Sequence, residues 1–189
     1  MSDTKANKER NKPKISIIVI VIVTIVATWM ILGVITRLIA FNARVVCQSN
    51  LSTLGKAMAM YAQENDGKYP TPSKWCDLLT EFPDITEKLF VCPADKEERC
   101  SYAMNPNCEP NSPSDIVLLF ETKGPGRISE LGLWNPYGGP VLLSFSNHDG
   151  YGGFVLFNDL SVQFVDFKRL GKLNWGDEQG NKKIETGNR

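Results

Sequence analysis

The sequence is poor in the residues from which most catalytic and metal sites are built. Its 189 residues include one histidine, His148, and its five cysteines form no Cys-x-x-Cys pair, which argues against a zinc site. Net charge is also lacking, because 21 basic residues balance 21 acidic ones. This balance gives no indication of a nucleic-acid partner.

Charge is absent from one long stretch near the start of the sequence. Residues 15–36 are 22 consecutive positions without a charged side chain, and most of them are apolar. As a helix rising about 1.5 Å per residue they would extend about 33 Å, which is enough to cross the hydrocarbon of a bilayer. We therefore predict a transmembrane helix over residues 15–40, preceded by a disordered cytoplasmic tail over residues 1–14.

The charges on either side of this stretch predict its orientation. Residues 1–14 contain five Lys or Arg and two acids, whereas Arg37 and Arg44 follow the stretch. Because basic flanks mark the cytoplasmic side, we expect a single pass with the N-terminus inside and the remainder outside. A cleaved signal peptide is the alternative, but the apolar run exceeds the usual length of such a segment and no Ala-x-Ala site follows.

The helical pattern continues beyond the apolar stretch with a single apolar seam. Its members recur at steps of three and four residues: Cys47, Leu51, Leu54, Met58 and Tyr61. Asn65-Asp66-Gly67 then provides a signal for the end of a helix. We expect residues 41–65 to continue the long helix and to pack on the chain's own sheet. A short coiled coil with a partner helix is the alternative.

The rest of the chain predicts short helices and a small sheet. A helix is expected over residues 74–82 with Ser73 as its cap, and a short extended piece over residues 101–104. The predicted strands cover residues 115–121, 141–145, 153–157 and 161–167. The fold class is therefore α+β, with a long N-terminal transmembrane and amphipathic helix packed on a small C-terminal antiparallel sheet. The extracytoplasmic domain would cover residues 41–175, and residues 176–189 would form a flexible tail.

Five cysteines outside the cytoplasm favour disulfide bonds. The candidates lie in a loop-rich segment: Cys76, Cys92, Cys100 and Cys108. Because the number of cysteines is odd, at least one thiol is free or pairs with another chain, and the sequence does not give the connectivity. Among the tryptophans, Trp175 is expected to be exposed, whereas Trp75 and Trp134 are expected to pack in the core or against loops.

His148 and its acidic neighbours are the remaining candidates for a site. A histidine beside Asp149 and, by chain reversal, Asp159 could bind a metal or act as a base. No nucleophile with a defined partner accompanies it, so we predict that the protein is not an enzyme. A structural hydrogen bond at a loop corner is the preferred interpretation of His148. Asp149, Asn158 and Asp159 could offer oxygen ligands to calcium, although no twelve-residue ligand loop is present. No other cofactor is predicted.

Several motifs occur in an order that resembles a known family. They are Cys47–Leu51, Asp66–Pro70, Cys92–Asp95, Ser101–Asn107, Leu118–Glu121, and Asn147-His148 followed by Val155–Asp159. Together they resemble the pseudopilin-like proteins of planctomycete-type bacteria, which are similar to type II secretion pseudopilins and carry a His-x9-Asp-Gly signature. The resemblance covers residues 37–167.

The resemblance implies a membrane-anchored structural protein of a type II secretion or pilus-type assembly. The anchor would lie in a bacterial inner membrane, the domain in the periplasm, and other pilin-like subunits would be partners. The chain departs from the family in two places, and the first is the N-terminal part of the long helix. No Gly precedes Ile15, and no acid occurs between it and Gln63, although the family's Glu is thought to pair with a neighbouring N-terminal amine. The missing acid favours the alternative, a stand-alone periplasmic or surface binding module that does not assemble, whereas the ordered motifs favour the assembly.

The second departure lies in the C-terminal signature. Ten residues rather than nine separate His148 from Asp159, and Leu160 occupies the position where the family has Gly. Glycine tolerates a positive φ in a tight turn, whereas leucine does so only at a cost. We therefore expect either a turn of a different type or a bend supplied by Asn158 and Asp159.

Overall fold

The computed structural model describes residues 12–95, 99–122, 134–148 and 150–176, with side chains from residue 17 onward. The chain divides into two compact units, residues 1–41 and 42–189. The described residues of the first unit all belong to helix α2. The candidate site lies in the second unit.

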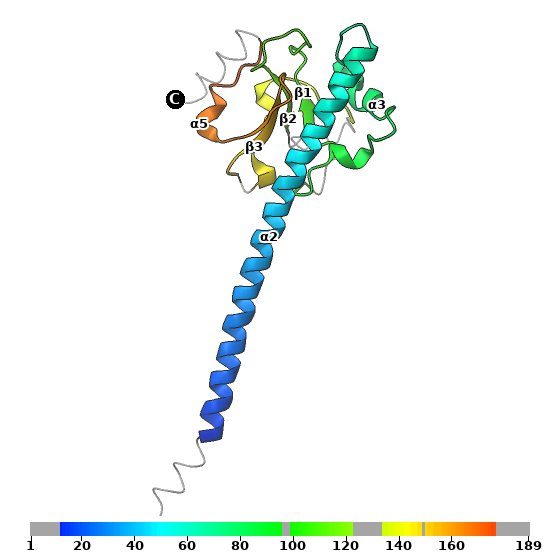
Figure 1. The fold of residues 1–189 in the computed structure, drawn as a ribbon. Helices are drawn as coiled ribbons and strands as arrows, with labels where there is room; N and C mark the ends of the chain where they lie inside the picture. Colours follow the sequence, from blue (N-terminus) through cyan, green and yellow to red (C-terminus); the bar gives the residue numbers. More distant parts are fainter. Residues whose placement is uncertain (1–11, 96–98, 123–133, 149, 177–189) are drawn as a thin grey trace, which may run out of the picture. The chain divides into compact units, whose positions relative to one another are not determined.

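Helix α2 covers Lys12–Glu64 and confirms the predicted long helix (Figure 1). Every side chain from Ile17 to Ile39 is exposed, including large apolar ones such as Trp29. A helix that is apolar on all sides is typical of a membrane span. Within the described ranges, α2 is the one helix long and apolar enough to cross a membrane, consistent with a single-pass protein.

The second part of α2 packs against the sheet of the second unit, as the seam predicts. The fifth member of the seam, Tyr61, is partly buried. The other four are fully buried: Cys47, Leu51, Leu54 and Met58. The buried face is wider than the seam, because Asn50, Ala57 and Ala62 are also buried. The helix therefore contributes one whole side to the core.

Four antiparallel strands form the sheet, in the order β1-β2-β3-β4. They are β1 (Tyr102–Met104), β2 (Val117–Glu121), β3 (Gly153–Phe157) and β4 (Val162–Val165). Three predicted strands and the predicted extended piece are thus present. The predicted strand over residues 141–145 is wrong: Pro140–Leu142 forms a 3-10 turn, and Leu143 makes only an isolated bridge to Thr122. Pro140 fixes its own φ and lacks an N–H, which favours this turn over a strand.

An irregularity in β2 determines which face of the sheet its last residue occupies. The register between β2 and β3 shifts between Val117 and Leu119. Leu118 and Leu119 consequently both join the core under α2, whereas Val117 and Phe120 belong to the core on the opposite face. Because side chains alternate along a strand, Glu121 then returns to the face covered by α2.

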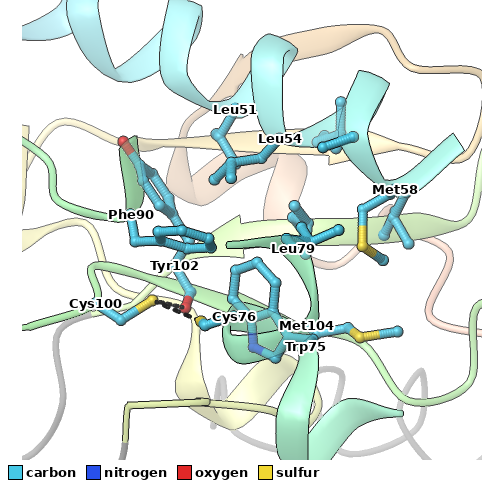
Figure 2. Packing of buried hydrophobic residues seen from close by; sticks show 14 of the residues in the cluster. Leu51, Leu54, Met58, Trp75, Cys76, Leu79, Phe90, Cys100, Tyr102 and Met104 are labelled. Atoms are coloured by element: carbon cyan, nitrogen blue, oxygen red, sulfur yellow. Dashed lines mark hydrogen bonds between the residues drawn. The ribbon is translucent and has the colours of Figure 1, made fainter. Parts of the chain in front are cut away.

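Two cores result, one on each face of the sheet. Figure 2 shows the larger core, in which Leu51, Leu54 and Met58 of α2 lie beside residues of α3 (Trp75–Leu79) and of β1. The smaller core lies on the opposite face of the sheet. Trp175, which follows α5 (Phe167–Leu170) in the chain, is fully buried there against Phe120, with ring centroids 5.0 Å apart. The prediction of an exposed Trp175 is therefore wrong, whereas Trp75 and Trp134 pack in or against the larger core as expected.

Two local expectations about caps and turns also change. Helix α3 begins at Trp75 after a 3-10 turn over Pro72–Lys74, so Ser73 lies inside that turn and makes no cap hydrogen bond. In the β3–β4 turn, Leu160 itself has a φ of 66°. The turn thus contains a left-handed leucine, and packing of Leu160 against the larger core offsets part of the backbone cost.

Candidate redox and metal centre

Four buried side chains converge between α2 and the sheet, and we call them the central cluster: Cys47, Cys92, Glu121 and His148. Their sulfur, oxygen and nitrogen atoms all lie within 4.8 Å of one another. They come from α2, from the segment after the η2 turn (Glu87–Phe90), from the end of β2 and from the η4 turn (Ser146–His148). In the part of the chain that the structure describes, no other group of three or more such residues could hold a metal ion.

A disulfide joins the two cysteines of the central cluster, with Cα atoms 5.3 Å apart. Cys92 was predicted to form a disulfide, but its partner Cys47 lies outside the predicted group. Asn50, one turn after Cys47, donates from Nδ2 to the carbonyl oxygen of Val91 at 3.1 Å. This bond links the Val91–Cys92 segment to α2 beside the disulfide.

The other three cysteines are free thiols, contrary to the predicted group: Cys76, Cys100 and Cys108. Cys76 and Cys100 are neighbours, with sulfur atoms 3.7 Å apart. Burial, followed by the hydrogen bond with Cys100, raises the pKa of Cys76. Burial, followed by the charge of Glu109, raises the pKa of Cys108 to about 12. These two thiols are therefore protonated at neutral pH.

The acid–base half of the central cluster is a buried pair. Nε2 of His148 lies 2.9 Å from Oε1 of Glu121, and the backbone N–H of Phe154 donates to Oε2 at 2.8 Å. His148 therefore makes a structural hydrogen bond, as preferred from the sequence, and its partner is Glu121, which was not predicted from the sequence. The sequence interpretation missed Glu121, although a carboxylate that ends an otherwise apolar strand is a recognisable signal.

The candidate calcium ligands are used differently. Oδ1 of Asn158 accepts from the Tyr69 hydroxyl at 2.8 Å, and its Nδ2 donates to the Ser112 carbonyl at 2.7 Å. Oδ1 of Asp159 accepts from the N–H of Ser161 within the turn. Asp149 lies outside the described residues. Asn158 and Asp159 thus hold the β3–β4 turn in place, and neither belongs to the central cluster.

Alkylation should report the state of the five cysteines and the pKa of Cys108. We expect iodoacetamide to add three groups to the unfolded, unreduced chain and five after reduction, as counted by intact mass. On the folded chain, the rate at Cys108 should rise about tenfold per pH unit from pH 8 to 11, because the thiolate fraction rises tenfold per unit below the pKa. A rate that levels off above pH 9 while circular dichroism is unchanged would contradict the raised pKa.

The central cluster combines two kinds of chemistry in one buried place. Its sulfur atoms can exist as a disulfide or as two thiols, and its imidazole and carboxylate can bind a proton or a metal ion. Two sulfur atoms beside an imidazole and a carboxylate fit redox or metal chemistry. Comparison of the chain with protein-family models, curated proteins and solved structures finds no match.

Proposed function

We propose that the protein is a non-enzymatic, membrane-anchored, pseudopilin-like structural subunit of a type II secretion or pilus-type assembly. The observation that carries this proposal is that the two parts of α2 have different surroundings. Its residues 17–39 expose uncharged side chains, except Arg37, on every side, whereas its residues 43–62 bury one face against an antiparallel sheet. The first part needs lipid or neighbouring helices as its surroundings, and the second part carries a folded domain.

The disulfide and the basic N-terminus support a position for each end of the chain. A disulfide in a folded domain fits an oxidising compartment such as the bacterial periplasm. The basic residues before Ile15 favour a cytoplasmic N-terminus. The protein would then be anchored in the inner membrane, with residues 42–176 in the periplasm.

A stand-alone periplasmic or surface binding module is the second candidate. It is favoured by one observation, the absence of any acidic side chain between Ile15 and Gln63. The family's assembly is thought to need such an acid in the membrane helix. The two candidates therefore differ in whether α2 contacts other pilin-like helices in the membrane.

Site-specific crosslinking in native membranes tests the proposal. A photoreactive residue at Val26, which is exposed on α2, should crosslink to other single-span pilin-like subunits or to further copies of this chain. A matched chain in which residues 15–40 are replaced by an unrelated single-span helix should lose these partners while keeping its disulfide. If both chains crosslink only to lipid, the stand-alone module is correct.

The intact mass of the protein from the same membranes provides a second readout. A mass beginning near Ile15 with a methylated N-terminus would show pilin-type maturation and support assembly. A mass beginning at residue 1 or 2 would show an uncleaved anchor and favour the module.

A further inference from the structure

The central cluster contains the donor atoms of a transition-metal site. Zn²⁺ binds thiolate sulfur, imidazole nitrogen and carboxylate oxygen in a tetrahedron, whereas Ca²⁺ and Mg²⁺ take oxygen ligands almost exclusively. Cys47 and Cys92 would supply two thiolates once their disulfide is opened, and His148 and Glu121 would supply nitrogen and oxygen. The donor set of the central cluster therefore selects zinc-class ions over calcium.

The distances within the cluster are close to those that zinc requires. Bonds of about 2.0–2.3 Å place tetrahedral donors about 3.3–3.8 Å apart. Nε2 of His148 lies 3.9 Å from the sulfur of Cys92 and 2.9 Å from Oε1 of Glu121, which brackets that range. To form the tetrahedron, the two sulfur atoms would have to move apart to about 3.8 Å after the disulfide is opened, and Nε2 of His148 and Oε1 of Glu121 would have to move apart by about 0.4 Å.

The surroundings of the cluster hold its ligands in position. The N–H of Phe154 binds Oε2 of Glu121, which leaves Oε1 directed at His148. The N–H of Cys92 donates to the hydroxyl of Ser101, which in turn donates to Asp95. Such outer partners orient metal ligands and are costly to lose.

The charge of a metal-bound cluster also has a counterpart nearby. Two thiolates, one carboxylate and Zn²⁺ sum to a single negative charge when the imidazole is neutral. Arg44 precedes Cys47 by three residues and so lies on the same side of α2. Its guanidinium carbon lies 5.4 Å from the centroid of the Phe164 ring, which in turn contacts His148. Its buried Nε has no hydrogen-bond partner among the described residues.

We propose that reduction of the Cys47–Cys92 disulfide converts the central cluster into a zinc-class metal site. A dithiol supplies two electrons and two protons to the disulfide and is itself oxidised to a disulfide. Zn²⁺ then binds both sulfur atoms and releases their two protons to solvent, while His148 and Glu121 complete the tetrahedron. The cluster thus has two alternative states, disulfide and metal-bound, and this inference does not depend on the proposed assembly function.

Metal binding by the full-length chain in detergent tests the proposal. The chain is reduced with dithiothreitol, freed of it without oxygen, mixed with Zn²⁺ and desalted. We expect about one zinc ion per reduced chain and none per oxidised chain, measured by elemental mass spectrometry. With Co²⁺ in place of Zn²⁺, the reduced chain should show sulfur-to-cobalt charge transfer and the intense visible bands of a tetrahedral site.

Three variants assign the ligands. Glu121→Gln and His148→Ala should each weaken zinc binding at least about tenfold, because loss of an outer partner already costs about 10–100-fold. Cys76→Ser should leave the number of zinc ions bound per chain unchanged, since the Cys76 thiol lies outside the cluster and contacts the Cys100 thiol.

Three results would overturn the proposal. One is a folded, reduced chain that binds no zinc. Another is zinc binding that survives both Glu121→Gln and His148→Ala and is lost with Cys76→Ser. The last is a reduced chain that unfolds and is not refolded by zinc, because a native metal site must stabilise the folded state.

Discussion

Replacing Leu54 by Asp should abolish the cooperative unfolding of the domain, because it places a carboxylate in the contact between α2 and the sheet. Leu54 is fully buried in the larger core (Figure 2). Removing a buried leucine side chain costs about 2–5 kcal/mol, and burying an unpaired polar group adds about 1–3 kcal/mol. The sum approaches the whole stability of about 5–15 kcal/mol that a domain of this size has. Thermal unfolding followed by circular dichroism measures the effect.

The close approach of α2 to the sheet leaves little room for relaxation around this site. A Cβ added to the adjacent Gly55 would lie 2.9 Å from Cδ2 of Leu156 in β3. Two controls separate packing from charge. Leu54→Met should cost less than about 1.5 kcal/mol, since it conserves volume, and Met60→Asp should have little effect because Met60 is half exposed. A Leu54→Asp chain with the wild-type melting temperature would show that α2 does not depend on this contact.

The fold was predictable wherever a periodic pattern extends over many residues. The apolar stretch and the seam from Cys47 to Tyr61 predict one long helix, and α2 covers Lys12–Glu64. The two apolar runs that flank Asn158-Asp159-Leu160 likewise predicted the β3–β4 hairpin. The short segment over residues 141–145 was misassigned because its four apolar residues and Ser144 carry no period that distinguishes a strand from a turn.

The central cluster was not predictable because its parts depend on long-range contacts. Glu121 faces α2 only because the β2 register shifts after Val117, and strict alternation from Val117 would place it on the opposite face. The four residues come from four elements, so no short motif joins them, and the missing Cys-x-x-Cys pair is uninformative here. The group of four candidate cysteines rested on nearness in sequence, whereas the observed partner of Cys92 is Cys47, 45 positions away.

Removing the Cys47–Cys92 disulfide should lower the free energy of unfolding by roughly 4 kcal/mol. The two residues are 45 positions apart, and cross-linking a loop of this length reduces the entropy of the unfolded chain by about that amount at 25 °C. A double variant, Cys47→Ser with Cys92→Ser, should therefore melt about 8–16 °C below the wild type. Calorimetry of the full-length chain in detergent, with a chelator present, measures this difference.

Reduction provides the matched control for this effect. Dithiothreitol should lower the melting temperature of the wild type to that of the double variant, and should leave the double variant unchanged because its three remaining cysteines are already thiols. Zn²⁺ added after removal of the chelator and the dithiol should raise the melting temperature of the reduced wild type but not that of the double variant, since only the former can bind zinc through two thiolates. A double variant as stable as the oxidised wild type would show that the loop between α2 and Cys92 is already constrained in the unfolded chain.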